Sequence, residues 1–386
     1  MKKLLSAMLA MALMATVFTG CDTSSSSSSS DGDNTFLIGG SGPLTGDYAT
    51  YGVSVKQGAQ IAIDEINAAG GVSGMTLALQ MEDDQADPEM AKSAYATLFD
   101  AGMKVSLGAV TSGACLSAAD EAYSDGMLML TPSGSAKECV DYDNAFRVCF
   151  NDPDQGKYAA NFIYDNAVAE NVAIIYDKST DYSAGITETF VAQAAEIGLN
   201  IVTQEAFTTS SNTDFSVQLQ SVKDSGADLV FLPIYAQEAA YILVQAETIG
   251  LDVIYFGCDG LDGILQKIGD ENVALTEGVM LLTPFAADSS EQIVVDFVAA
   301  YNEAYNETPD QFAADGYDAV YTVKAAIEEA GITSPDADDL NEALISAMTA
   351  IEVVGTTGTM TWGADGEPVK NATAVVITDG VYVAFN

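Results

Sequence analysis

The chain has 386 residues, 48% of them hydrophobic and 18% charged, a composition typical of a folded protein with one large or two smaller domains. Only 13 Lys and Arg residues accompany 56 Asp and Glu residues, so the formal net charge is −43. Nucleic acid is excluded as a partner, because too few cations are present to neutralise phosphates. The chain has no histidine, which excludes Ser-His-Asp and Cys-His catalysis and histidine-ligated zinc.

The N-terminal residues predict a lipoprotein leader. Two lysines and the apolar run 4–18 have the order of a secretory signal peptide, which we place at 1–20. The Thr-Gly-Cys ending resembles a bacterial lipobox, in which Cys21 carries the lipid; an ordinary cleavage site with a chance cysteine is the alternative. A serine-rich tether, 21–34, follows. We therefore expect an extracytoplasmic protein that is anchored to the cell membrane through Cys21.

Beyond the tether, strand-like apolar runs alternate with helical patterns. A first series begins with strand 36–38 and continues with helix 52–69, strand 76–81, helix 88–101, strand 104–108, helix 114–124 and strand 127–130. The polar turn NDPDQG (151–156) interrupts the alternation. A second series then runs through helix 155–168, strand 172–176, helix 183–197, strand 199–204, helix 213–225, strand 228–232, helix 236–249 and strand 253–256. Regular βαβ succession predicts parallel sheets with helices on both faces, so the fold class is α/β with two doubly wound lobes.

The C-terminal part of the sequence has a different pattern. It predicts long helices near 290–306 and 312–330, a third near 337–348, and then the hairpin-like stretch GTMTWGADGEPVKNATAVVI. Helices placed between the second strand series and these terminal strands suggest that the chain returns to the first lobe and then to the second. Composition alone does not fix where those crossings lie.

In open α/β sheets, ligands bind beyond the carboxyl ends of the strands. The loops at those positions are rich in hydroxyls, glycines and single tyrosines and nearly lack cations; they are 41–52, 109–114, 131–136, 177–185, 233–238 and 258–263. Neither GxGxxG nor GxxxxGK[ST] spacing occurs, so a nucleotide is not expected. A zwitterionic amino acid fits this inventory. Ser112 and the Ser133–Ser135 loop suit its carboxylate, and Asp259 suits its ammonium, although each feature alone is also typical of caps, turns and packing.

Four cysteines follow Cys21, and a disulfide is permitted outside the cell. Cys115 and Cys139 flank two loops that we expect to face one pocket, so we favour a bridge between them. For Cys149 and Cys258, a buried free thiol is nearly as good an expectation. No CxxC spacing occurs, and no metal site is expected.

The ordered motifs SGPLTGDYATYG, DEINAAGGVSG, EDDQADP, LGAVTSGA, LMLTPSGSA, FRVCFNDPDQG, IIYDKSTDYSAG and FGCDGLDG resemble the branched-chain amino acid binding proteins of bacterial ABC importers. These are type I periplasmic binding proteins. The resemblance runs from about Thr35 to the C-terminus. It implies three crossovers between lobes, which we place near 150, 282 and 355. The first lobe would then be 35–150 plus 283–354, and the second 151–282 plus 355–386, with the ligand held in a cleft that closes over it.

The resemblance also implies a set of binding residues. The carboxylate site would be Ser112 with the backbone near Val110 and Thr111, and the amino-group contacts would be the Ser133 carbonyl, Ser135 and Asp259. The wall positions would be Tyr51, Tyr182, Tyr235 and Phe312. The chain departs from the family's pattern in two ways. The acidic partner is usually Glu, so Asp259 is one methylene shorter, and a disulfide found in some members would need cysteines where Ala86 and Thr111 stand.

We therefore expect a substrate-binding lipoprotein that captures a Leu/Ile/Val-like amino acid and delivers it to the permease subunits of an ABC importer. A monomer without cofactor is expected. The alternatives are the same scaffold with another small ligand, such as an amide, urea, an aromatic acid or another amino acid, or a sensor's ligand-binding domain. An enzyme is not expected, because Ser112 and Cys115 have no histidine base and neither Lys104 nor Lys137 stands at a known Ser/Lys spacing.

Overall fold

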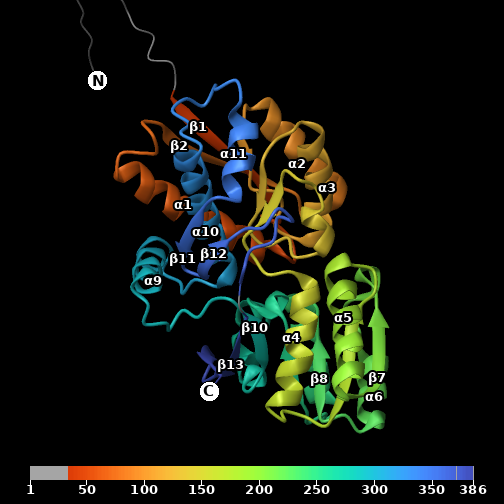
Figure 1. Ribbon diagram of the computed structural model, residues 1–386. Helices are drawn as coiled ribbons and strands as arrows, with labels where there is room; N and C mark the ends of the chain where they lie inside the picture. Colours follow the sequence, from red (N-terminus) through yellow and green to blue (C-terminus); the bar gives the residue numbers. More distant parts are fainter. Residues whose placement is uncertain (1–33, 371, 386) are drawn as a thin grey trace, which may run out of the picture. The chain divides into compact units, whose positions relative to one another are not determined.

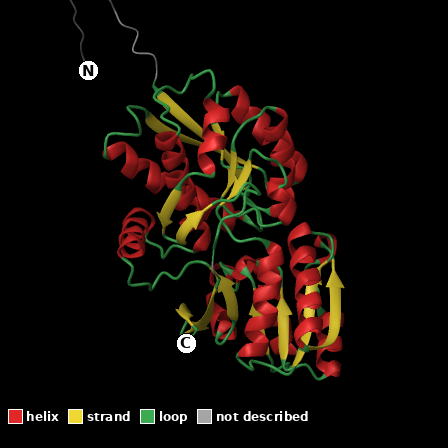
Figure 2. Cartoon of the chain, viewed as in Figure 1, coloured by secondary structure: helices red, strands yellow, loops and turns green. Residues whose placement is uncertain are grey.

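The computed structural model describes residues 34–370 and 372–385, so the predicted signal peptide, nearly all of the tether and Cys21 lie outside the described residues. In the described part, the helices and strands form two α/β lobes (Figure 1). Figure 2 shows each lobe as a sheet flanked by helices. No helix of this part has the length and the apolar character needed to cross a membrane.

The first lobe is built on a five-stranded parallel sheet of order β2-β1-β3-β4-β5. Its strands are β1 (Thr35–Gly42), β2 (Thr76–Asp83), β3 (Val105–Ser106), β4 (Met129–Thr131) and β5 (Ala145–Arg147). One face packs on α1 (Ala49–Ala68), α9 (Gln292–Tyr305), α10 (Gln311–Glu329) and α11 (Leu340–Met348). The other face packs on α2 (Pro88–Asp100) and α3 (Ser112–Ser124), which the short helix η1 (Lys137–Val140) follows.

The second lobe is built on a seven-stranded sheet of order β14-β13-β10-β9-β8-β6-β7. Its strands are β6 (Asn171–Asp177), β7 (Asn200–Phe207), β8 (Leu229–Leu232), β9 (Ile254–Gly257), β10 (Met280–Thr283), β13 (Thr373–Thr378) and β14 (Val381–Ala384). Its helices are α4 (Asp152–Asp165), α5 (Asp181–Ile197), α6 (Ser216–Ser225), α7 (Ala236–Thr248) and α8 (Ile264–Lys267), with short turns η2 (Thr209–Ser211), η3 (Asp259–Leu261) and η4 (Asp270–Thr276).

Side chains of β6 show why both faces of this sheet are covered. Successive side chains of a strand point to opposite faces. Val172 and Ile174 accordingly enter the core formed with α4 and α5, whereas Ala173 and Ile175 enter the core formed with α6 and α7. A strand buried on both sides must be apolar at every position, which accounts for the unbroken run that predicted it.

The last two strands correct the expectation of purely parallel sheets. Strand β13 pairs antiparallel with β10, and β14 pairs antiparallel with β13. The turn between β13 and β14 contains Asp379 and Gly380, with φ values of 52° and 75°. Positive φ at both central residues of a two-residue turn is what a tight hairpin requires, and Asp-Gly meets that requirement at low cost.

The chain passes between the two sheets three times, after β5, after β10 and before β13. The third passage differs from the predicted boundary near 355. Strands β11 (Glu352–Gly355) and β12 (Gly358–Thr361) form an antiparallel hairpin, and Met360 and Trp362 are buried in the core of the first lobe. The Trp362 Nε1 atom also donates to the Arg147 carbonyl of β5 at 2.7 Å. We therefore place the third crossing after Trp362.

Candidate functional site

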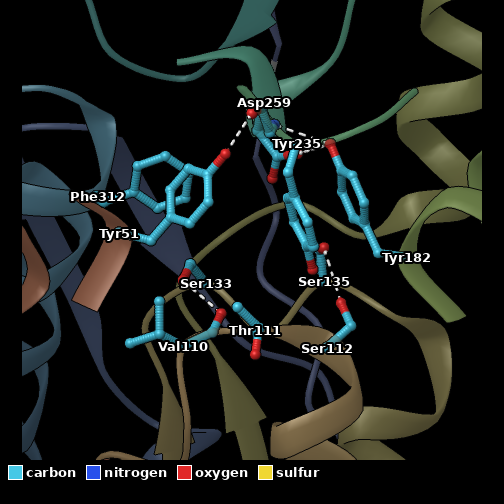
Figure 3. Close-up of a pocket in the computed structure, with 11 residues that line it drawn as sticks. Tyr51, Val110, Thr111, Ser112, Ser133, Ser135, Tyr182, Tyr235, Asp259 and Phe312 are labelled. Carbon is cyan, nitrogen blue, oxygen red and sulfur yellow. Dashed lines mark hydrogen bonds between the residues drawn. The ribbon is translucent and has the colours of Figure 1, made fainter. Parts of the chain in front are cut away.

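The ten residues singled out in the sequence line one cavity in the structure (Figure 3). They are Tyr51, Val110, Thr111, Ser112, Ser133, Ser135, Tyr182, Tyr235, Asp259 and Phe312, and Gly260 joins them. Most lie in loops after β3, β4, β6, β8 and β9, because the carboxyl ends of parallel strands meet at one edge of each sheet. The free volume of the cavity is about 10 Å³, roughly the room that one water molecule needs.

Hydroxyl groups of the first lobe form one end of the cavity. The Oγ atoms of Ser112 and Ser135 lie 3.4 Å apart, and the Ser112 Oγ accepts the Ala136 N–H at 3.1 Å. The Ser133 hydroxyl donates to the Val110 carbonyl at 2.8 Å, which fixes the two loops against each other. Figure 3 shows these side chains gathered beside the start of α3.

The N-terminus of α3 faces the same end of the cavity. Thr111 is its N-cap residue, but the Thr111 side chain accepts no hydrogen bond from the first-turn N–H groups. The Thr111 Oγ1 atom is itself buried without a partner in the described chain. The first N–H groups of a helix carry partial positive charge and attract anions. This end of the cavity is therefore suited to a carboxylate.

Arg147 supports the serine loop from behind and was missed by sequence reasoning. It is completely buried and donates to the carbonyls of Gly134, Ala136 and Lys137 at 2.9–3.0 Å. Its Nε atom lies 3.1 Å from Glu367 Oε2 in an ion pair. A buried guanidinium that binds three carbonyls of one loop holds that loop in a single conformation.

Asp259 forms the other end of the cavity. Its Oδ1 atom accepts a hydrogen bond from the Tyr182 hydroxyl at 2.7 Å, and its N–H donates to Gln155 Oε1 at 3.0 Å. Burial raises the pKa of Asp259 to about 6, although the bonds from Tyr182 and Gln155 favour the charged form. A buried carboxylate with a raised pKa is suited to a cationic partner.

A second buried carboxylate, Asp152, is bonded to the serine loop and was not among the predicted site residues. Its N–H donates to the Ser135 carbonyl at 2.9 Å, and its Oδ1 atom accepts from Gln155 Nε2 at 3.4 Å. Its Oδ2 atom is buried without a partner in the described chain. Burial raises its pKa well above the usual value, and the charge of Asp259 adds to the effect. The sequence signal that could have identified Asp152 is the NDPDQG turn, which contains this residue and interrupts the strand–helix alternation.

Aromatic rings from both lobes form the walls. Tyr235 stacks on Tyr182 with ring centroids 4.9 Å apart, and Tyr51 meets Phe312 edge-on at 4.7 Å. The Tyr51 hydroxyl, from the first lobe, donates to the Gly260 carbonyl at 2.7 Å and accepts the Ala236 N–H at 2.8 Å. These two bonds join the lobes directly, so the structure is a closed conformation.

The structure corrects the expected disulfide. The described cysteines are free, buried thiols, Cys115 and Cys139 among them. The Cys139 Sγ lies 3.8 Å from the Ser112 carbonyl, which it can reach as a donor, and its contact with Cys115 lowers the pKa of the Cys115 thiol. The two thiols thus have hydrogen-bonding partners within the core. Among the described residues, no group of carboxylates and thiols is arranged to hold a metal ion.

The fold and the site define the class of protein: two doubly wound lobes closed over a cavity that each lobe lines, the type I periplasmic binding protein fold. The family model described as periplasmic binding protein matches residues 35–381. The Leu/Ile/Val-binding protein BraC3 of Rhizobium johnstonii is 31% identical over 86% of this chain and 88% of its own length. The chain therefore belongs to the periplasmic binding protein family, whose members are extracytoplasmic solute-binding proteins and not enzymes.

Other relatives agree with this assignment. The leucine-, isoleucine-, valine-, threonine- and alanine-binding protein of Pseudomonas aeruginosa is 30% identical over 78% of this chain and 80% of its own length. The branched-chain amino acid transporter substrate-binding protein LivJ of Streptococcus pneumoniae, solved in complex with isoleucine, has a TM-score of 0.83 at 28% identity, covering 91% of this chain and 98% of that one. The chain is a substrate-binding protein of the ABC-transporter type.

Proposed function

We propose that the chain captures a neutral aliphatic α-amino acid, Leu/Ile/Val-like, between its lobes and delivers it to an ABC importer. The observation that carries the proposal is the polarity of the cavity. An anion-binding helix end and hydroxyls lie at one side, a buried carboxylate lies at the other, and aromatic rings lie between them. A zwitterion with an apolar side chain matches all three features.

The carboxylate of the ligand would bind at the start of α3. The first N–H groups of that helix lack a side-chain cap, and the hydroxyls of Thr111 and Ser112 lie beside them. A ligand carboxylate would supply the missing acceptor and would interact favourably with the helix dipole.

The ammonium group would bind to Asp259. Among the five ion pairs of the described chain, none involves this carboxylate. Its ionisation in a buried site is therefore unfavourable until a cation arrives, and the ligand ammonium would supply that charge. A neutral or anionic ligand would leave the carboxylate unpaired.

Binding would be coupled to closure of the lobes. The Tyr51 hydroxyl bonds to Gly260 and Ala236 across the lobes, and the Tyr48 hydroxyl donates to Glu238 Oε1 at 2.7 Å. With the Tyr235 ring in place, the cavity has room for about one water molecule, so a ligand enters only when the lobes open or this ring moves aside. A ligand that contacts both lobes then shifts the population toward the closed form.

Isothermal titration of the purified protein with the twenty amino acids tests the ligand class. Saturable binding of one or more of Leu, Ile and Val is expected, with no binding of Asp, Glu, Lys or Arg. Heat-silent titrations with all twenty would overturn the proposal. Saturable binding of an aromatic acid or an amide alone would instead favour another small ligand on the same scaffold.

The membrane anchor and the importer are part of the same proposal. Cys21 follows an apolar signal-like run and precedes a serine-rich tether. Metabolic labelling with a tagged fatty acid should modify the wild-type protein and leave Cys21→Ser unlabelled. Labelling of both proteins would contradict the anchor without affecting the ligand assignment. Uptake of labelled leucine by cells that lack the protein, compared with complemented cells, tests delivery.

A further inference from the structure

A second cavity lies on the side of the molecule where the chain crosses between the lobes. Its volume is about 500 Å³, and it shares no residue with the cavity that contains Asp259. The lining comes from both lobes: α8, β10, β13 and β14 on one side, and α9 with the segment leading into α10 on the other. Figure 1 shows β10 and β13 near this crossing. We call this space the hinge cavity.

Most of the hinge cavity is apolar. Aliphatic and aromatic side chains from five elements and one connecting segment form its wall: Leu265, Leu281, Phe285, Val298, Val375, Val381 and Val383. A lining of this kind is suited to a hydrocarbon body and not to a hydrated inorganic ion. No lysine or arginine is among the described residues that line it.

Two buried carboxylates, one from each lobe, also line the hinge cavity. Asp262 is 6% exposed and follows η3, whereas Asp310 is 8% exposed and caps α10. Burial raises the pKa of both groups. The charge of Asp262 raises that of Asp310 further, and the charge of Asp259 does the same for Asp262. Two acids held at this depth without a cation lack the partner that would stabilise their ionised forms.

The hydrogen bonds of the two carboxylates leave one oxygen unused. Asp310 accepts from the Ser54 hydroxyl at 2.7 Å and from the Ala313 N–H at 2.9 Å. Asp262 Oδ2 accepts from the Gln311 N–H at 2.9 Å, and the Gly263 N–H and the Tyr382 hydroxyl also favour the charged form of this carboxylate. Asp262 Oδ1 is buried and has no hydrogen-bond partner of ordinary geometry in the described chain. An unpartnered carboxylate oxygen beside an apolar space is a binding feature for a donor that carries positive charge.

We propose that the hinge cavity is a second binding site, for a small organic ammonium with an apolar body. The ammonium binds to Asp262 Oδ1 and is stabilised by the charge of Asp310. The hydrocarbon body occupies the space between β10, β13 and α9. Because the two carboxylates belong to different lobes, the bound cation interacts with both lobes. The site does not depend on which solute the cleft binds.

The test uses 1-aminoadamantane, with 1-adamantanol as a neutral probe of the same shape, in isothermal titrations at about pH 8, where carboxylates are ionised and the amine is charged. The amine should bind saturably at one site, and the alcohol should bind at least about tenfold more weakly. Equal affinities for the two probes would mean an apolar cavity without a cation site, and absence of amine binding would also overturn the proposal.

Three variants locate the bound amine. Asp262→Asn keeps the acceptor for the Gln311 N–H but removes the charge, and it should raise the dissociation constant about ten- to a hundredfold. Asp288→Asn, an exposed carboxylate at the same cavity, should change it less than about threefold. Asp259→Asn removes a cleft charge that raises the pKa of Asp262, so at about pH 8, where Asp262 is already ionised, it should leave amine binding intact. Loss of binding in Asp259→Asn, or none in Asp262→Asn, would sink the proposal. If Asp262→Asn does not fold, Asp310→Asn, which retains the helix cap, replaces it.

Discussion

The Tyr182 hydroxyl donates to Asp259 Oδ1 at 2.7 Å, and the same hydroxyl accepts the Gly260 N–H at 2.8 Å. Tyr182 lies in the first turn of α5, which follows β6, and Asp259 follows β9. The bond therefore joins two segments that follow strand ends of one lobe. A neutral donor orients the carboxylate without neutralising it. The charge of Asp259 therefore remains available to a ligand.

Replacing Asp259 by Asn should strongly weaken the binding of an α-amino acid. The amide has the same size and still accepts from Tyr182, but it lacks the charge that a buried ammonium needs. We expect the dissociation constant for leucine to rise about a hundredfold or more. Titration calorimetry measures it, with Asp141→Asn on an exposed loop as the control for charge alone. Equal affinity in Asp259→Asn and wild type would mean that the ligand amine lies elsewhere.

Binding should also depend on pH through Asp259. Only the ionised carboxylate binds an ammonium, and burial raises its pKa to about 6. Affinity should therefore be level above that pH and fall by up to about tenfold per pH unit below it. Tyr182→Phe removes a bond that favours the charged form, so the pH at which affinity falls should move upward. A profile that is flat from pH 7 down to about 5 would exclude Asp259 as the ammonium partner.

Much of the fold was predictable from periodicity. The helix predicted at 88–101 is α2, which starts where Asp87 accepts from the N–H groups of Glu89 and Met90. The helix predicted at 183–197 is α5, which ends where Gly198 adopts a φ of 82°. Both ends are set by local chemistry, capping at one and a left-handed residue at the other. Such signals are visible in the sequence.

The parts that depend on distant contacts were not predictable. Strand β5 has only three residues and ends in Arg147. An arginine is expected at the surface, but this one is buried because three carbonyls of another loop accept hydrogen bonds from it. The third crossing was placed too early because Trp362 finds its partner 215 residues away. For the site, strand order alone brings the loops together, but the position of the Tyr235 ring depends on three other tyrosines.

Stability should rise when the pH is lowered from neutrality to about 5. Burial raises the folded-state pKa of Asp259 from its ordinary value of 3.8 to about 6, and raises the pKa values of Asp262 and Asp310 as well. Between these values the folded chain holds protons that the unfolded chain has lost. The contribution of these protonated carboxyl groups to stability is thus complete below about pH 4 and is lost as the pH rises through about 6.

Thermal denaturation of the ligand-free protein measures this effect. Repulsion among the surface charges (net charge −43) also weakens as the pH falls, so it changes stability in the same direction. The series is therefore repeated at about 1 M salt, which screens exposed charges more than buried ones. The pH dependence should persist there and should flatten in the variant Asp259→Asn with Asp262→Asn. A stability that falls steadily from pH 7 to 5 in both salts would contradict the raised pKa values.

Replacing Arg147 should destabilise the protein and disturb the serine loop. Arg147→Lys retains the charge but loses the planar arrangement that binds the carbonyls of Gly134, Ala136 and Lys137. We expect a loss of about 3 kcal/mol in the free energy of unfolding. Lys104→Met, which breaks an ion pair with the exposed Asp336, should cost less than about 1 kcal/mol. Similar losses in the two variants would mean that Arg147 is not essential to its loop.

Replacing Tyr235 by Ala should change which amino acids fit the cleft. The Tyr235 ring stacks on Tyr182 at 4.9 Å and, with its neighbours, leaves a free volume of about 10 Å³. Removing it opens space and removes apolar contact, so leucine should bind at least about tenfold more weakly. Tryptophan should be affected less or should gain affinity, and the ratio of the two dissociation constants should shift by about tenfold toward tryptophan. Tyr123→Ala, whose ring is exposed, is the matched control and should leave the ratio unchanged. An unchanged ratio in Tyr235→Ala would show that this ring does not limit the size of the ligand.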